Sequence, residues 1–264
     1  MEISEYTPGT FCWIELVTSD GDGAKKFYAD LFGLGFNDQP VGEDAVYTML
    51  NKEGKNVAAL YQMNEEQKSR GIYPHWNSYV SVKSADETTE KVKSLGGTVT
   101  MEPFDVFDAG RMAMFQDPTG ASFAVWQPNQ HIGAQLTNDP GTLCWNELVT
   151  NDTQKAGEFY TRLFGWTSNT DSGSPPYTMF MNGERPAGGM LEIQKEWGEV
   201  PPNWVVYFAV KDCDASAEKA TSLGAKILSP PTDVPEIGRF AVIQDAQGAA
   251  FAIIKLEKPT SEKD

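Results

Sequence analysis

Two glutamates, each placed two positions after a tryptophan, are the residues of this sequence that could most directly do acid–base chemistry. They are Glu15, after Trp13, and Glu147, after Trp145. Side chains alternate between the two faces of a strand, so each glutamate shares a face with its tryptophan. A carboxylate beside an indole on an inward face loses hydration, which raises its pKa and suits it to take a proton next to a carbonyl group. The alternatives are ligand binding without catalysis, and a structural role in which an arginine or backbone amides hold the carboxylate.

Two arginines could recognise an anionic group. Arg111 and Arg239 each follow a glycine at the start of an expected strand. A guanidinium can clamp a carboxylate or an oxyanion with paired hydrogen bonds. The alternative is a salt bridge that fixes the preceding loop, which contains Asp105 in the first case and Asp233 in the second.

The residues around Glu15 predict a strand followed by a helix. Residues 11–18 are typical of a strand, and a helix is expected over about residues 20–32, with Asp20 as its cap and Gly33 at its end. The helix would cover one face of the strand, and the other face would line a cup.

Alternation assigns the side chains of this strand to its two faces. Cys12, Ile14 and Leu16 are expected to pack under the helix. Trp13 and Glu15 are expected to face the cup.

The same order of elements recurs along the chain. The phrase that begins at Pro8 returns at Pro140, and self-similarity of this kind indicates a repeat architecture. In the first half, further strands are expected at 45–50, 56–61, 76–83, 98–101, 111–116 and 122–127, a second helix at 85–95, and a polar linker at 63–74. The sequence therefore predicts an α+β fold of four tandem βαβββ units, with cupped mixed sheets and helices outside. The units form two homologous halves, residues 1–134 and 135–264.

The composition indicates an ordinary globular protein with a strong negative charge. The chain has 264 residues, three cysteines and a formal net charge of −16. Such a charge repels phosphate groups, so neither nucleic acid nor a membrane is expected as a partner. The acidic start of the chain does not look like a signal peptide, no apolar run reaches the length of about 18 residues of a membrane span, and few cysteines fit a reducing compartment. We expect a cytoplasmic protein that is a monomer or a weak homodimer.

The repeated motifs resemble a known family. They are W-x-E-L-x-T-x-D followed by F-Y-x-x-L-F-G, Gly-Arg before a strand, and Asp117-Pro118-Thr119-Gly120 before a last strand. This combination is similar to the vicinal oxygen chelate superfamily of glyoxalases, bleomycin-resistance proteins and extradiol dioxygenases. The resemblance covers essentially the whole chain and is nearest to two-half actinobacterial members, which include a mycobacterial culture-filtrate antigen. It implies cupped sheets that hold a metal or a ligand.

The positions at which metal-using members of that family carry His, Glu or Gln hold other residues in this chain. Alignment on the motifs places Trp13, Asn77, Ala124, Trp145, Val205 and Ala252 there. Indole and alkyl groups cannot bind a metal, so we expect no metal and no cofactor. The two histidines, His75 and His131, fall in connecting segments and are interpreted as surface or hinge residues.

Tryptophans at these positions suggest that the cups hold something other than a metal. Trp13 could stack on a planar compound, or it could plug an empty cup. Trp126 and Ser122 share the face of Ala124, whereas Ile254 and Ala250 replace them in the second half, so the two cups should differ. The candidate ligand-binding residues are Trp13, Glu15, Asn77, Arg111, Ser122, Trp126, Trp145, Glu147 and Arg239.

Three functions compete on this reading. The first is metal-independent binding of a small planar or amphipathic molecule, which the aromatic residues favour. The second is a glyoxalase-type lyase or isomerase acting on small carbonyl compounds, with Glu15 and Glu147 as candidate catalytic residues. The third is an interaction protein with degenerate cups and an acidic surface.

Overall fold

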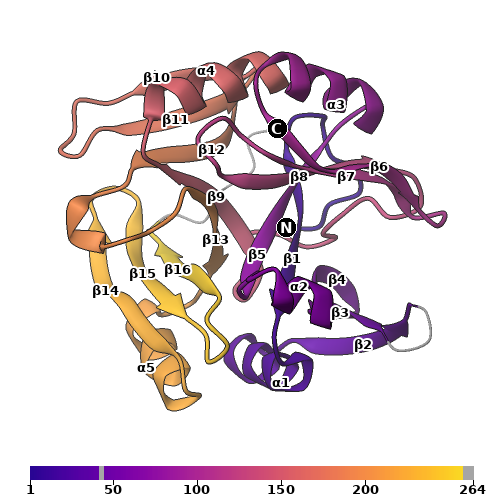
Figure 1. The fold of residues 1–264 in the computed structure, drawn as a ribbon. Helices are drawn as coiled ribbons and strands as arrows, with labels where there is room; N and C mark the ends of the chain where they lie inside the picture. The colour runs from indigo at the N-terminus through magenta and orange to yellow at the C-terminus, as the bar shows by residue number, and fades with distance from the viewer. Residues whose placement is uncertain (42–44, 258–264) are drawn as a thin grey trace.

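Two eight-stranded mixed sheets form the protein, and each draws its strands from one half of the chain (Figure 1). A computed structural model describes residues 1–41 and 45–257. The first sheet contains β1 (Phe11–Thr18), β2 (Gly35–Pro40), β3 (Val46–Lys52), β4 (Lys55–Gln62), β5 (His75–Ser81), β6 (Thr98–Val106), β7 (Gly110–Gln116) and β8 (Ser122–Pro128). The second contains β9 (Leu143–Thr150), β10 (Thr167–Thr170), β11 (Tyr177–Asn182), β12 (Arg185–Glu192), β13 (Asn203–Ala209), β14 (Lys226–Val234), β15 (Gly238–Gln244) and β16 (Ala250–Leu256). The helices are α1 (Gly21–Phe32), α2 (Glu65–Ser69), α3 (Ala85–Ser94), α4 (Thr153–Phe164), α5 (Cys213–Ser222) and the short 3₁₀ helix η1 (Lys195–Trp197).

Each sheet consists of two βαβββ units side by side. The order of the first sheet is β2-β3-β4-β1-β5-β8-β7-β6, and that of the second is β10-β11-β12-β9-β13-β16-β15-β14. The first strand of a unit pairs parallel with the last strand of the same unit, and the first strands of two neighbouring units pair antiparallel. The predicted four-unit fold is confirmed, and a cup is built from neighbouring units within one half.

Capping and an apolar stripe explain why the long helices form where they do. The Asp20 side chain accepts a hydrogen bond from the Gly23 amide, and Gly33 ends α1 in the left-handed conformation. Asp152 caps α4 in the same way, through the Lys155 amide. One stripe of each helix is buried; in α1 it consists of Gly21, Ala24, Phe27, Tyr28, Leu31 and Phe32.

The helices lie on the convex faces of the sheets, and the two convex faces pack against each other. One core cluster joins Ile14 and Phe27 of the first half to Phe208 and Phe251 of the second. Another joins residues of the second and third units. Figure 1 shows the consequence: α1 lies beside α5, α3 lies beside α4, and β5, β9 and β13 cross at the centre. The concave faces, which form the two cups, therefore point away from each other.

The prediction that Cys12 packs under the helix is wrong. The pairing of β1 with β5 shifts register between Phe11 and Trp13, which is a β-bulge. Phe11 turns into the core between the halves, where its ring lies 4.8 Å from that of Trp204. Cys12 consequently packs in the same cup cluster as Trp13, while Ile14 packs under the helices as expected.

Smaller differences concern the connecting segments. Residues 63–74 contain α2, which begins with a capping box at Asn64, rather than an unstructured linker. His75 is the first residue of β5 and not part of a loop. No helix within the described residues has the length and apolar character needed to cross a membrane.

Candidate functional site

A tryptophan, a glutamate and two tyrosines form one hydrogen-bonded cluster in the first cup. The Tyr47 and Tyr79 hydroxyls donate to the two carboxylate oxygens of Glu15, at 2.8 and 3.0 Å. The Trp13 indole N–H donates to the Tyr47 hydroxyl at 3.3 Å. Strand β1 supplies Trp13 and Glu15, and its neighbours β3 and β5 supply the tyrosines. The expected partners of Glu15, an arginine or backbone amides, are therefore replaced by two phenols.

The second cup repeats this cluster. The Tyr207 hydroxyl donates to Glu147 Oε1 at 2.8 Å, and the Trp145 indole donates to the Tyr177 hydroxyl at 3.1 Å. The elements are the repeat equivalents β9, β11 and β13. We call these four-residue groups the Trp–Tyr–Glu–Tyr clusters.

The surroundings of both glutamates favour the protonated form. Burial raises the pKa of Glu15 above its ordinary value, and hydrogen bonds from the tyrosines partly oppose this. Burial raises the pKa of Glu147 in the same way, against the bonds from Tyr207 and Tyr177. A carboxyl group of this kind can accept a proton or share one with a ligand.

Gly189 makes room for the second cluster. It pairs with Glu147 across β12 and β9, where Ala59 pairs with Glu15 in the first half. A Cβ atom at position 189 would overlap the Tyr177 hydroxyl and lie 3.1 Å from the Trp145 indole nitrogen. Crowding in the strand therefore explains why glycine stands at position 189.

The residue opposite the glutamate differs between the cups. Asn77 pairs with Glu15 across β5 and β1, and Val205 pairs with Glu147 across β13 and β9. Asn77 is 3% exposed. Its side-chain nitrogen has no hydrogen-bond partner among the described residues.

His131 lies in the first cup rather than on the surface or at a hinge. Its ring meets Trp13 edge-on at 4.6 Å between centroids and lies 5.8 Å from the ring of Trp126. The Trp126 indole donates to the His131 carbonyl oxygen at 2.7 Å. Trp13 and Trp126, both candidate ligand-binding residues, therefore contact the same residue of the segment that joins the halves. Burial lowers the pKa of His131.

The rest of that joining segment is tied to the same cup. We call residues 129–136 the strap. The Ala134 amide donates to the Cys12 carbonyl at 2.7 Å, and the Tyr6 hydroxyl donates to the Ala134 carbonyl at 2.7 Å. The Cys12 carbonyl faces Gly133, where a Cβ atom would collide with it. The sequence offered no signal for this path, because the strap contains no periodic pattern.

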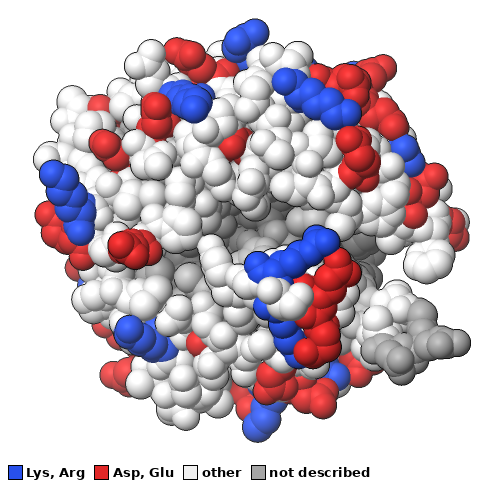
Figure 2. Space-filling view, viewed as in Figure 1, with Lys and Arg blue, Asp and Glu red and all other residues white. Residues whose placement is uncertain are grey.

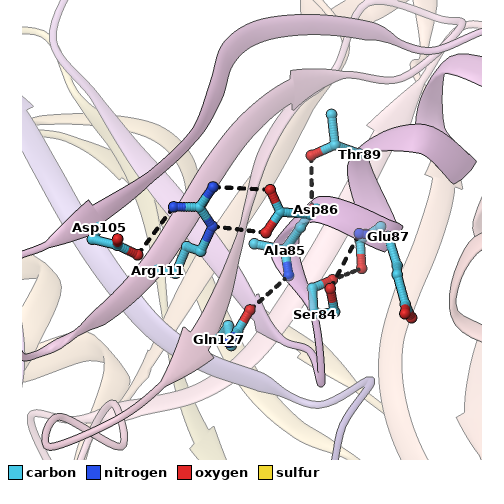
Figure 3. Close-up of polar contacts among 9 residues, drawn as sticks. Ser84, Ala85, Asp86, Glu87, Thr89, Asp105, Arg111 and Gln127 are labelled. Atoms are coloured by element: carbon cyan, nitrogen blue, oxygen red, sulfur yellow. Dashed lines mark hydrogen bonds and ion pairs between the residues drawn. The ribbon is translucent and has the colours of Figure 1, made fainter.

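Both arginines lie on the convex side of the sheets and pair with aspartates. Arg111 donates two hydrogen bonds of 2.8 Å to Asp86 at the start of α3 and one of 3.0 Å to Asp105 (Figure 3). Arg239 repeats the arrangement with Asp214 and Asp233. These contacts favour the salt-bridge alternative. Neither arginine lies at a Trp–Tyr–Glu–Tyr cluster.

The remaining predicted site residues divide between the cup and its rim. Trp126 and Ala124 belong to the buried cluster of the first cup, and Ile254 and Ala252 to that of the second. Ser122, at the start of β8, is exposed. The tyrosines of both clusters were missed, although their recurrence at equivalent positions of the two halves was a usable signal.

The residues present do not fit the metal centre that the fold implies. Within the described residues, no group of three or more His, Cys, Asp or Glu side chains could hold a metal ion. Trp13 and Ala124 stand where ligands would be needed, and both Glu15 oxygens already accept phenols.

Comparison with known proteins identifies relatives over almost the full length. The family model described as the Glyoxalase/Bleomycin resistance protein/Dioxygenase superfamily matches residues 10–125 and 141–253. The putative glyoxylase CFP32 of Mycobacterium tuberculosis is 44% identical over 255 residues, which are 96% of this chain and 97% of the relative. The anthracycline biosynthesis protein DnrV of Streptomyces peucetius is 34% identical over 270 residues, with 97% and 96% covered.

Solved structures share the fold at low sequence identity. The Mn(II)-bound glyoxalase from Novosphingobium aromaticivorans has a TM-score of 0.65 and 18% identity, covering 97% of this chain and 86% of that one. The 2,3-dioxygenase LapB from Pseudomonas sp. KL28 has a TM-score of 0.65 and 10% identity, covering 99% and 98%. At these identities the likeness concerns the fold alone.

Proposed function

The chain belongs to the glyoxalase/bleomycin resistance protein/dioxygenase superfamily, and on that premise we propose that it binds a small planar or amphipathic molecule in a cup without a metal. One observation carries the proposal: the Trp–Tyr–Glu–Tyr cluster occurs twice, at the place where a metal centre would need ligands. An indole offers a flat apolar surface, and the adjoining carboxyl and phenol groups can orient polar atoms of a ligand.

The names of two relatives agree with a planar ligand. They are anthracycline biosynthesis proteins. Anthracyclines are fused-ring planar compounds, and a compound of that shape suits a flat wall made by an indole.

The partners proposed for the protein follow from its charge. With a net charge of −16, it is proposed to bind neither nucleic acid nor an anionic membrane. Figure 2 shows Lys and Arg side chains of the described residues lying beside Asp and Glu on the face drawn. Free Cys12, Cys144 and Cys213 fit the proposed cytoplasmic location, and the proposed oligomeric state is a monomer or weak homodimer.

Metal analysis and a ligand screen test the proposal together. Elemental analysis of the purified protein is expected to find no stoichiometric zinc, nickel, iron or manganese. A thermal-shift screen of planar aromatic compounds is expected to raise the melting temperature with at least one of them, because a ligand that binds the folded state stabilises it. About one tightly held metal per half, or no response to any planar compound, would contradict the proposal.

A second candidate function is a lyase or isomerase reaction on a small carbonyl compound. The raised pKa of Glu15 and Glu147, each beside tyrosine hydroxyls that could stabilise an oxyanion, favours it. Turnover of small aldehydes or ketones that disappears in Glu147→Gln, with the fold intact, would support it. Turnover that survives in both Glu15→Gln and Glu147→Gln would exclude the glutamates as the base.

A further inference from the structure

The two cups differ in how far their walls are buried. Trp13 is 4% exposed and Glu15 is 7% exposed. Their repeat equivalents, Trp145 and Glu147, are half-buried. A ligand can contact only wall residues that are partly exposed. The wall of the second cup is therefore open to a ligand, and the wall of the first cup is not.

The strap explains why the first cup is the more buried. It places the His131 ring against Trp13 and Trp126 and holds it there through the bond from Trp126 to the His131 carbonyl. Tyr6 packs against the same cluster and bonds to the strap. An aromatic ligand entering between these two indoles would have to displace the imidazole of the chain itself.

The two carboxylates also differ in their polar partners. Both oxygens of Glu15 accept a tyrosine hydroxyl. Glu147 accepts from the Tyr207 hydroxyl at Oε1, and the Tyr177 hydroxyl, which accepts from the Trp145 indole, is the second phenol beside this carboxyl. Val205 stands opposite Glu147 where Asn77 stands opposite Glu15, so Glu147 has fewer polar neighbours and can accept a donor from a ligand.

Resting on the proposed ligand-binding function, we infer that the chain binds one ligand per molecule, in the second cup, and that this ligand is a planar aromatic compound carrying a hydroxyl or amino donor. Trp145 supplies the stacking surface, and Phe240 and Val242 add apolar wall, because all three pack on the same cup cluster. Glu147 accepts the donor. In the first cup, the imidazole of His131 already packs against Trp13, the repeat equivalent of Trp145.

Calorimetric titration of the full chain with 2-naphthol, a planar compound with one hydroxyl donor, tests the assignment. One site per chain is expected. Trp145→Ala should weaken binding about tenfold or more, as loss of a stacking aromatic does elsewhere. The matched variant Trp13→Ala should change affinity by less than about twofold, since the two cups lie apart and act independently. Circular dichroism checks each fold, and Trp13→Phe replaces Trp13→Ala if the latter fails to fold.

Removing the imidazole should create a second site. His131→Ala leaves the space between Trp13 and Trp126 without its occupant, so the stoichiometry with 2-naphthol should rise from one to two. His131→Phe keeps a ring in that place and should leave the stoichiometry at one. A stoichiometry of one in both variants would overturn the role assigned to His131.

The remaining outcomes separate the inference from the function on which it rests. Binding that is lost in Trp13→Ala and kept in Trp145→Ala, or two sites in the unaltered protein, overturns the assignment to the second cup while ligand binding stands. Binding of other planar compounds but not of 2-naphthol overturns the donor requirement. No binding of any planar compound overturns both the inference and the proposed function.

Discussion

At the scale of single residues, the main feature of the first cup is the buried Glu15 carboxyl group, which accepts hydrogen bonds from two tyrosines. Glu15 is 7% exposed and its charged form is desolvated, so its pKa is raised in the folded state. Tyr47 and Tyr79 donate to its two oxygens. The cluster therefore combines a structural role with a titration that stability measurements can detect.

The first prediction concerns this titration. Because the folded pKa of Glu15 lies above the ordinary value of 4.5, its contribution to stability is full below that pH and is lost as pH rises through the folded pKa. Glu15→Gln keeps an acceptor and a donor for the two tyrosines but does not titrate. Urea denaturation should show the unaltered protein losing free energy of unfolding relative to Glu15→Gln as pH rises from 4.5 into the alkaline range. A constant difference across that range would contradict the raised pKa.

The second prediction concerns Gly189. Gly189→Ala forces Tyr177 and its hydroxyl away from the strand, because a methyl group and the phenol cannot share the space. Overpacking of this kind costs about 1–3 kcal/mol, which thermal unfolding would detect, and 2-naphthol binding should weaken with it. Ala59→Gly makes the reverse change at the equivalent place and is the control, since it should leave 2-naphthol binding unchanged. Normal stability and binding in Gly189→Ala would show that Tyr177 has another position available.

At the scale of elements, the arginine clamps join each helix start to a hairpin. Arg111 ties the first turn of α3 to β6 through Asp86 and Asp105, on the side of the sheet away from the cup. Its guanidinium lowers the pKa of Asp86. This arrangement recurs at Arg239 and belongs to the repeat unit rather than to one cup.

The third prediction follows from the position of the clamp. Arg111→Gln removes all three hydrogen bonds to the aspartates. The melting temperature should fall slightly at low salt, and the difference should shrink at high salt because exposed ion pairs are screened. Affinity for 2-naphthol should not change. Weaker ligand binding at an unchanged melting temperature would instead restore the alternative that the arginine clamps an anionic ligand group.

The sequence predicted the elements better than it predicted their surroundings. Strand β1 has the predicted limits of residues 11–18 because its apolar residues end at a capping aspartate, Asp20. The bulge at Cys12 was not predictable from alternation, since it depends on Phe11 reaching Trp204 in the other half. The place of His131 depends on the path of the strap, which no local pattern records.

At the scale of the whole molecule, two equivalent polar contacts hold the halves together. The Tyr28 hydroxyl on α1 donates to Asp245, in the turn after β15, at 2.9 Å and accepts from the Trp76 indole at 3.1 Å. The Trp204 indole donates to Tyr160 on α4 at 2.8 Å, and Tyr160 faces Asp117. Burial raises the pKa of Asp245, and the bond from Tyr28 partly opposes that rise.

The fourth prediction tests the first of these contacts. Tyr28→Phe leaves the Asp245 carboxyl and the Trp76 indole without this shared partner in a buried site. The expected loss is about 1–3 kcal/mol in the free energy of unfolding, measured by urea denaturation. Tyr73→Phe is the control, because Tyr73 is 61% exposed and should lose little. Equal stability of the two variants would mean that the buried hydroxyl contributes nothing.

The fifth prediction concerns the halves themselves, residues 1–134 and 135–264, which the repeat suggests as domains. Their convex faces supply the two large core clusters jointly: Phe32 packs on Phe208 at 4.7 Å between ring centroids, and Phe123 on Tyr160 at 5.4 Å. A half expressed alone would expose these rings as a large apolar face, and such faces drive aggregation. Each half should therefore be insoluble or non-cooperative in thermal unfolding when produced alone, whereas co-expression should give a stable complex with the melting behaviour of the full chain. A single half that is soluble and unfolds cooperatively would show that a cup and its two helices are sufficient for folding, and that the contacts between the halves only add stability.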